Sequence, residues 1–456
     1  MSGRLPVAAL RHRMRQAVLA ALWPAAQLGQ HVLGRVFVWV TRPLLSRVAQ
    51  NFLTLPPPRL GREPRVTILL LGAYGMGGTI RTVFNLAGYL SHRYDVEVVS
   101  IGRRRRRPML PFPPGVTMTT LDDSFAERAT AGGALRAVLG RCPSALVHVQ
   151  DRRYGAFSLW TDLLLLSFLR DLRGVVITTR PGLNLVAARH APLATRTIGQ
   201  EHMNLRSHRA VLRADILKHY PRLDALAVLT ESDLHDYSAL FESGAPPIVR
   251  MPNAVTAIDG PRSDLTARVV VAAGRLTPQK GFDLLLPAWV PVAAAHPDWR
   301  LQIYGAGPER ARLEALINES GLADTVRLMG RTNRLGHAFS QSSVFVLSSR
   351  REGLPMVILE AMSKGLPVVS FDCPTGPAEI VVTDQNGMLV PDGDVEGLSQ
   401  ALLRVIEDDE MRVRLGTGAL QTAAGYDIER IGQRWSELID ELAAQPSRNV
   451  QSGLGR

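Results

Sequence analysis

The strongest constraint on the fold is an alternation of short apolar runs with longer segments of helical periodicity. Short continuous apolar runs that end in glycine or a polar turn are typical of buried parallel strands, which need helices to connect them. The alternation therefore predicts an α/β fold with doubly wound sheets. The runs predicted as strands are Val66–Leu71, Val96–Ile101, Ala145–Val149, Val175–Thr178, Ala225–Leu229, Val269–Ala273, Arg300–Tyr304, Val326–Met329, Val344–Leu347, Val368–Phe371 and Met388–Val390.

The alternation begins afresh after Met251-Pro252-Asn253, which interrupts the first series of strands and helices. A chain of 456 residues is long enough for two domains, each with its own core. We expect Thr79–Leu90 and the amphipathic segment Ile428–Ala444 to be helices. The predicted parts are a basic leader with a Pro-rich linker at 1–62, Rossmann-like domains at 63–250 and 251–427, and a C-terminal helix with a disordered tail at 428–456.

The net charge of +12 is confined to two places. Residues 1–62 contain nine Arg, no Lys and no acidic residue, and the run Arg103 to Arg107 adds five more positive charges, which leaves −2 for the remainder. A protein whose body coats nucleic acid would spread its basic residues over a face or a helix, so we expect no nucleic-acid partner. Two basic patches suit an anionic membrane surface.

The leader is too polar to span a membrane. Its longest stretch without charged residues has 19 residues, and Pro24 and Gln27 interrupt it, whereas a spanning helix needs about 20 mostly apolar residues. Arginines alternate there with Leu, Val, Phe and Trp, as in helices that lie in a membrane interface, although a mobile leader without a role would look similar. Cys142 and Cys373 lie far apart and suggest no disulfide framework. We expect a cytoplasmic protein, peripheral at the inner face of the cell membrane.

The richest motif, Arg350 to Met362, follows the predicted strand Val344–Leu347 directly. Pro355 suits the first position of a helix, and the free backbone N–H groups of the helix start would bind an anion. The residues offered for this anion site are Gly353, Leu354, Pro355 and Met356. Glu352 and Glu360 flank it, and a carboxylate can accept hydrogen bonds from two adjacent sugar hydroxyls. In isolation, the same two residues would more often be an exposed glutamate and a salt-bridged one.

A second motif, Gly274 to Gly281, follows the predicted strand Val269–Ala273. Ligands of open α/β sheets gather at the carboxyl ends of the strands, where Arg275 and Lys280 would both lie. Arg275 offers a bidentate fork and Lys280 a point charge, so the pair is suited to neutralise a diphosphate. A pair of solvated loop cations is the alternative.

Two further candidates lie in the first half. The loop Tyr74 to Arg81 contains Gly77 and Gly78, which let the backbone approach a phosphate or a sugar closely. Its glycine spacing does not fit dinucleotide binding, which disfavours an NAD-dependent oxidoreductase. His202 follows an apolar segment and would lie at a strand end facing a cleft. A single histidine is more often structural than catalytic.

At these four places the chain resembles the family 4 glycosyltransferases, retaining enzymes of the GT-B fold. Glu352 and Glu360 match that family's E-x7-E motif, Gly274 to Gly281 matches G-R-x4-K-G, and Gly77-Gly78 matches its N-terminal glycine loop. The resemblance covers roughly residues 66–444. It implies two Rossmann-like domains that face a central cleft, with the acceptor bound on the 63–250 side and the nucleotide-sugar donor on the 251–427 side.

The resemblance also implies a role for each matching residue. Glu352 would contact the donor sugar, Glu360 the ribose hydroxyls, and Arg275 with Lys280 the diphosphate. Gly330 and Arg331 fall where family members contact the base. The residues implied to be catalytic are Glu352, His202, Arg275 and Lys280. The implied partners are a UDP- or GDP-linked sugar donor and a glycan or lipid-linked acceptor, with net retention at the anomeric carbon and no cofactor.

We expect no metal at the site, because cations and a helix start would stabilise the leaving diphosphate. Asp392-Gly393-Asp394 formally spells D-x-D, the metal–diphosphate motif of other transferases, but we interpret it as a turn followed by a helix N-cap. Two other functions remain open. A sugar-nucleotide epimerase of the same fold would need no acceptor, and a non-catalytic membrane adaptor would need none of these motifs.

Overall fold

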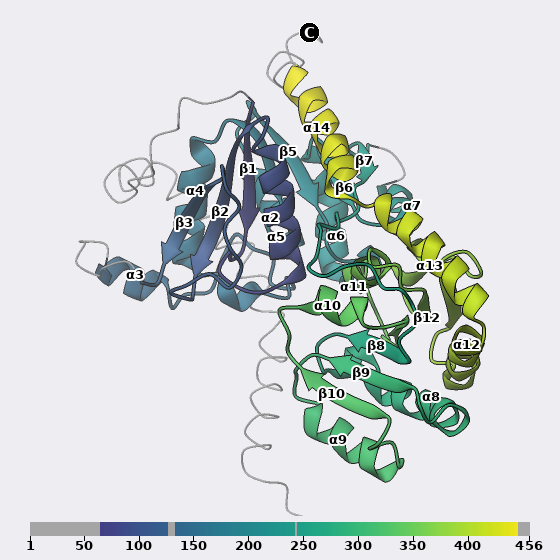
Figure 1. Ribbon diagram of the computed structural model, residues 1–456. Helices are drawn as coiled ribbons and strands as arrows, with labels where there is room; N and C mark the ends of the chain where they lie inside the picture. Colours follow the sequence, from purple (N-terminus) through teal and green to yellow (C-terminus); the bar gives the residue numbers. More distant parts are fainter. Residues whose placement is uncertain (1–63, 126–132, 242–243, 446–456) are drawn as a thin grey trace, which may run out of the picture.

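The computed structural model describes residues 64–125, 133–241 and 244–445. These residues form two α/β parts, in each of which helices cover a parallel sheet (Figure 1). This confirms the α/β class and the two doubly wound sheets. The predicted leader at 1–62 and the tail at 446–456 lie outside the described residues. In the described part of the chain, no helix is both long and apolar enough to cross a membrane.

The first sheet has the strand order β3-β2-β1-β4-β5-β6-β7, and all neighbours are parallel. Its chain order reverses between β1 and β4, which makes that pair the topological switch point. The strands are β1 Arg65–Leu70, β2 Asp95–Arg103, β3 Thr117–Asp123, β4 Gly174–Thr178, β5 Thr195–Gln200, β6 Ala225–Val228 and β7 Ile248–Arg250. The helices are α2 Gly78–Leu90, α3 Gly133–Leu139, α4 Leu159–Arg170, α5 Pro181–His190, α6 Ala210–His219 and α7 Glu231–Phe241.

The second sheet has the order β10-β9-β8-β11-β12-β13, again parallel, with its switch point between β8 and β11. The strands are β8 Val269–Ala273, β9 Arg300–Tyr304, β10 Val326–Gly330, β11 Val344–Leu347, β12 Val368–Asp372 and β13 Gly387–Pro391. The helices are α8 Phe282–Ala295, α9 Arg310–Glu319, α10 Leu335–Ser340, α11 Met356–Met362, α12 Val395–Glu407, α13 Asp409–Ala424 and α14 Ile428–Ala444.

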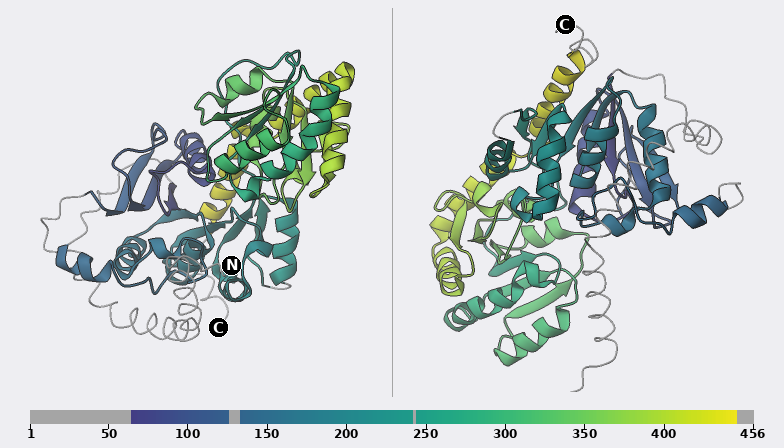
Figure 2. Two further views of the ribbon diagram at one scale, coloured as in Figure 1. Left: turned by 90° about the horizontal axis from the view of Figure 1, so that it is seen from below. Right: turned by 180° about the vertical axis from the view of Figure 1, so that it is seen from behind.

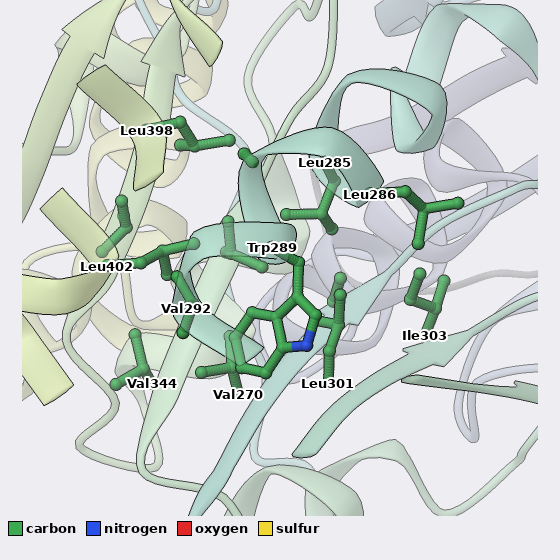
Figure 3. Packing of buried hydrophobic residues seen from close by; sticks show 14 of the residues in the cluster. Val270, Leu285, Leu286, Trp289, Val292, Leu301, Ile303, Val344, Leu398 and Leu402 are labelled. Carbon is green, nitrogen blue, oxygen red and sulfur yellow. The ribbon is translucent and has the colours of Figure 1, made fainter. Parts of the chain in front are cut away.

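Both faces of each sheet are buried because successive side chains of a strand point to opposite sides. In β8, Val270 packs with α8, α9 and α12, whereas the adjacent Val271 packs with α10 and α11. Trp289 of α8 is fully buried at the centre of the first of these clusters, and its indole Nε1 donates a hydrogen bond to Thr325 Oγ1 at 3.2 Å. Figure 3 shows the apolar side chains that surround it, among them Val270, Leu285, Val292, Leu301, Val344 and Leu402.

Helix α14 returns to the first part of the molecule, although it follows the second sheet in sequence. Its apolar face, including Ile431, Trp435 and Ile439, packs in one cluster with Val66 of β1 and with α2. Tyr94 Oη donates a hydrogen bond to Asp440 Oδ1 at 2.9 Å. Figures 1 and 2 show α14 beside the first sheet in views from opposite sides. The amphipathic helix predicted at Ile428–Ala444 is confirmed, and its partner is the first domain.

One predicted strand is wrong. Residues 145–149 form bends and turns, because the carboxylate of Asp162 in α4 accepts hydrogen bonds from the backbone N–H groups of Ala145 and Leu146. These groups are therefore not free to join the sheet, although Leu146 and Val147 are buried in the core. The apolar run at 145–149 therefore reflects burial in the core and does not indicate a strand. Strands β3, β5 and β7 were missed because they are polar or short.

Candidate active site

The centre of the site is an ion pair between Lys280 of the motif Gly274 to Gly281 and Glu352 of the motif Arg350 to Met362. Lys280 Nζ lies 2.6 Å from Glu352 Oε1, and Ser349 Oγ donates a hydrogen bond to the same oxygen at 2.6 Å. The exposed fractions of the Lys280 and Glu352 side chains are 15% and 9%. Because an ammonium group has three N–H donors and Glu352 takes one, Lys280 can still donate to a ligand.

The two motif loops are fastened to each other by further contacts. Arg350 reaches from the loop after β11 to form a bidentate pair with Asp283 of α8, at 2.7 and 2.9 Å. That pair lowers the pKa of Asp283, chiefly through the hydrogen bonds from Arg350. Gly281 has φ +64°, and a Cβ there would lie 1.9 Å from the carbonyl oxygen of Ser348. A side chain at this position would therefore push the loops apart.

The other residues that the sequence analysis assigned to the donor follow strands at the carboxyl edge of the second sheet. Arg275 follows β8 and is exposed, and its side chain makes no ion pair with the described residues. Gly330 ends β10 with φ +77°, and Arg331 follows it exposed to solvent. Both loops adjoin the strand ends at which ligands of such sheets bind.

The helix start after Glu352 differs slightly from the prediction. Pro355 is the N-cap residue of α11 rather than its first helical residue, because its ψ of 88° is not helical. The preceding turn is anchored instead through Glu352, whose backbone N–H donates to Pro374 O at 3.0 Å. The helix that follows has seven residues. Gly353 and Leu354 therefore lie in the loop that leads into it.

Glu360 of α11 binds a residue of the other domain. Arg81 of α2, which belongs to the glycine loop, places Nη1 2.8 Å from Glu360 Oε1. Burial raises the pKa of Glu360, and the positive charge of Arg81 opposes that rise. The exposed fraction of the Glu360 side chain is 12%, whereas Arg81 is half exposed. The second carboxylate oxygen of Glu360 can accept a hydrogen bond from a ligand hydroxyl.

The first domain contributes a pocket at its switch point between β1 and β4. Its volume is about 470 Å³, within the usual range for small-ligand sites. The glycine loop enters it through Gly75 and Gly77, and His202 lines it after the end of β5. Gly77 caps α2, and Gly78 is the first residue of that helix. The other polar or charged residues lining the pocket include Arg104, Arg105, Arg153, Thr179 and Arg180.

His202 is uncharged at neutral pH. Burial, reinforced by the charge of Arg180, lowers its pKa to about 4. Its Nε2 is buried without a hydrogen-bond partner among the described residues. The neighbouring Glu201 is buried and held in place, because its carboxylate accepts hydrogen bonds from Asn184 Nδ2 at 2.9 Å and from the Tyr220 hydroxyl. An unpaired, neutral imidazole in a pocket can exchange a hydrogen bond with a bound ligand.

The two halves of the site meet at His202 and Gly353. The carbonyl oxygen of His202 lies 3.5 Å from the place that a Cβ on Gly353 would take. The Arg81–Glu360 pair joins the glycine loop to the same motif, and Lys280 pairs with Glu352. The four sequence motifs, which come from two domains, therefore meet at one interface. A further contact joins the two domains at this interface. The carboxylate of Glu379, in the second domain, accepts hydrogen bonds from the backbone N–H groups of Glu231 and Ser232 at the start of α7.

Some residues of the site were missed by the sequence analysis. Arg180 lies in the pocket beside His202 and is paired with the buried Asp151. It comes two residues after the predicted strand Val175–Thr178, so its position at a strand end was a usable signal. Ser349 lies two residues after the predicted strand Val344–Leu347 and gave the same signal. Arg153 gave no comparable signal, because it follows no predicted strand directly.

No group of three or more His, Cys, Asp or Glu side chains that could hold a metal ion occurs within the described ranges of the chain. Asp394 is the N-cap of α12, where its Oδ1 accepts a hydrogen bond from Gly397 N at 2.9 Å, and Gly393 has φ +76°. The interpretation of Asp392-Gly393-Asp394 as a turn and helix cap is therefore confirmed. Cys142 and Cys373 are both free thiols, and burial raises the pKa of Cys373 to about 12.

Comparisons with known proteins show what this chain is similar to. Residues 257–422 match the family described as Glycosyl transferases group 1. An exopolysaccharide phosphotransferase of Streptomyces coelicolor is 33% identical over 389 residues, which are 84% of this chain and 41% of that protein. The amylovoran biosynthesis glycosyltransferase AmsD of Erwinia amylovora is 27% identical over 397 residues, 82% of this chain and 99% of that protein. This chain thus spans less than half of the Streptomyces relative and nearly all of the Erwinia one.

Among solved structures, the pneumococcal O-GlcNAc transferase GtfA in complex with UDP and GlcNAc superposes with a TM-score of 0.64 and 16% identity. The match covers 84% of this chain and 99% of that structure. At this identity the likeness establishes the fold. It confirms the predicted GT-B architecture.

Proposed function

We propose that this protein is a retaining glycosyltransferase, because residues 257–422 match the family described as Glycosyl transferases group 1. It transfers a sugar, a hexose or a related residue, from a nucleotide-diphosphate donor to a glycan or lipid-linked acceptor. The donor lies at the carboxyl edge of the second sheet, and the acceptor enters through the pocket of the first domain.

The observation that carries the proposal is the Lys280–Glu352 pair at the domain interface. A sheltered ammonium and carboxylate 2.6 Å apart form a site that can bind both a phosphate oxygen and a sugar hydroxyl. Glu352 contacts the donor sugar, and Lys280 with Arg275 neutralises the diphosphate. The loop Gly353 to Met356 contributes backbone N–H groups to the same anion.

The nucleotide occupies the adjoining surface of the second domain. Glu360 accepts hydrogen bonds from the ribose hydroxyls, and Gly330 with Arg331 contacts the base. We favour a UDP- or GDP-linked donor. Support for UDP comes from the structural neighbour that was crystallised with UDP and GlcNAc.

In the proposed reaction the bond between the anomeric carbon and the diphosphate oxygen breaks, and its electron pair leaves with the diphosphate. The acceptor hydroxyl attacks the same face of the sugar, and its proton passes to an oxygen of the leaving phosphate. Lys280 and Arg275 stabilise the charge that develops on the leaving group, so the chemistry needs no metal ion. Preorganised donors of this kind contribute about 2.7–4 kcal/mol each to transition-state stabilisation. The neutral His202 binds the reacting sugar from the acceptor side.

The acceptor belongs to the cell envelope in this proposal. Support comes from the Erwinia relative, whose name assigns it to amylovoran biosynthesis. The basic leader at 1–62 holds the protein at the cytoplasmic face of the membrane, where a lipid-linked acceptor would be presented. The leader acts through its nine arginines.

A donor screen tests the proposal. Purified protein is incubated with a panel of UDP- and GDP-sugars, and nucleotide release, thermal stabilisation and the stereochemistry of the sugar product are measured. We expect slow nucleotide release from one donor, abolished in Glu352→Gln. Conversion of the donor into its epimer without release of the nucleotide would instead identify a sugar-nucleotide epimerase. No stabilisation and no turnover with any donor would contradict the proposal.

A further inference from the structure

A second pocket adjoins the one that contains His202. It has a volume of about 370 Å³ and shares Arg180, Pro181 and Met203 with the first pocket. The two together extend along the carboxyl edge of the first sheet, from the glycine loop to the start of α6. This shape suits an extended ligand that occupies more than one subsite.

Arginine is the dominant charged residue of both pockets. The arginines that line them are Arg104, Arg105, Arg152, Arg153, Arg180 and Arg209. Asp151 is the single acidic residue among the lining residues of the two pockets. Its carboxylate is already occupied, because it pairs with Arg180 and accepts hydrogen bonds from the backbone N–H groups of Arg153 and Gly182.

Four of these arginines keep their charge uncompensated. Arg104 is neutralised by Asp122 at 3.1 Å and Arg180 by Asp151. The side chains of the other four are exposed and form no ion pair with the described residues; they are Arg105, Arg152, Arg153 and Arg209.

Guanidinium groups gathered around a concave surface repel one another and raise the local positive potential, which favours an anionic ligand. Their planar forks match phosphate and carboxylate groups, with which they form charge-assisted hydrogen bonds. A neutral glycan carries no charge for these guanidinium groups to attract, and uncharged side chains such as serine or asparagine could supply hydrogen bonds to its hydroxyls.

We propose that the acceptor is itself anionic, and that it carries phosphate or carboxylate groups close to the hydroxyl that receives the sugar. This rests on the proposed function. Arg105 and Arg153 bind the group nearest the reacting hydroxyl, beside His202, and Arg152 with Arg209 bind the next group along the chain. The neutral state of His202 leaves the arginines as the charged groups that select the acceptor.

Binding measured without donor tests the charge of the acceptor directly. The probes are inorganic tripolyphosphate, trigalacturonic acid and the neutral trisaccharide maltotriose, titrated by calorimetry into the full-length protein. We expect at least one anion to bind, with an affinity that falls as salt rises, and maltotriose to bind far more weakly. The tighter of the two anions distinguishes a phosphate-bearing acceptor from a carboxylate-bearing one.

Variants assign the binding to this surface. The double variant Arg105→Ala/Arg153→Ala removes two exposed, unpaired side chains, so it should fold normally and bind the anion at least about tenfold more weakly. Arg170→Ala, an exposed arginine outside both pockets, is the control and should bind as the wild type does. Binding that is lost in Lys280→Ala but kept in the double variant would place the anion at the donor site and overturn the proposal.

Failure of both anions to bind, or equal binding of maltotriose, would also overturn it. These outcomes can be told apart from a failure of the proposed function. Donor hydrolysis by the wild type is measured separately and needs no acceptor. Anion binding without stabilisation or turnover by any donor would refute the proposed function, whereas hydrolysis without anion binding would refute the anionic acceptor.

Discussion

Removal of Lys280 gives the sharpest test of the site, because it should change activity and stability by amounts that can be separated. The ammonium group lies 2.6 Å from Glu352 Oε1, and both side chains are largely sheltered from solvent, at 15% and 9% exposure. Lys280→Met keeps most of the apolar stem of the side chain and deletes the charge. The variant therefore isolates the electrostatic contribution of Lys280.

For stability, the substitution leaves a buried carboxylate with one remaining side-chain partner, the hydroxyl of Ser349. Removing one member of a buried ion pair costs about 3–5 kcal/mol. Because Ser349 still donates to Glu352, we expect a loss near the lower limit, about 3 kcal/mol. The double variant Lys280→Met/Glu352→Gln removes both charges and should recover most of that loss. Urea unfolding measures both values.

For activity, Lys280→Met removes a group that stabilises the leaving diphosphate. Loss of one such donor lowers kcat by about a hundredfold to a thousandfold. Nucleotide release from the donor measures this. The double variant should be at least as inactive although its stability recovers, because it also lacks the carboxylate of Glu352. A single variant that turns over within threefold of the wild type would refute the catalytic assignment. Loss of activity only in proportion to the fraction of unfolded protein would show that Lys280 acts through folding alone.

Three other predictions follow from the site and the leader. Burial lowers the pKa of His202 to about 4, so the folded protein stays unprotonated at a pH where the unfolded chain, with a pKa near 6.5, has taken up a proton. Between pH 7 and pH 4 the free energy of unfolding of the wild type should therefore fall by about 3 kcal/mol more than that of His202→Gln. The same fall in both proteins, measured by urea unfolding, would contradict this. Transfer should persist in EDTA, and its loss with rescue by Mn²⁺ or Mg²⁺ would indicate a metal-dependent mechanism. Deletion of residues 1–60 should abolish most binding to anionic vesicles in sedimentation assays, since each arginine near such a surface contributes about 1 kcal/mol. Donor hydrolysis should be preserved, and equal vesicle binding by both forms would exclude a membrane role of the leader.

Much of the proposed donor site could be predicted because its signals are local. Strand β11 is a continuous apolar run, the residues after it lie at a strand end by necessity, and the spacing of Glu352 and Glu360 can be read directly from the sequence. The same holds for Lys280 after β8. Hydrophobic periodicity and turn residues act over a few positions, so they determine where strands end and which side chains follow them.

The pockets of the first domain, which we propose to bind the acceptor, could not be predicted in the same way. Leu146 and Val147 have the composition of a strand, yet a carboxylate in α4 holds the backbone of this segment. The pairing of Arg81 with Glu360 joins residues 279 positions apart. The arginines of the two pockets come from four separate segments of the first domain, and no spacing in the chain relates them.

The sequence by itself determined the α/β class, most of the strands, the amphipathic helix Ile428–Ala444 and the residues of the four motifs. The tertiary structure decided that this helix packs on the first domain, that Lys280 pairs with Glu352, and that His202 meets Gly353 across the interface. The physical reason is the range of the interactions. Backbone conformation follows from neighbouring residues, whereas burial, ion pairing and a lowered histidine pKa depend on which distant segments share a core.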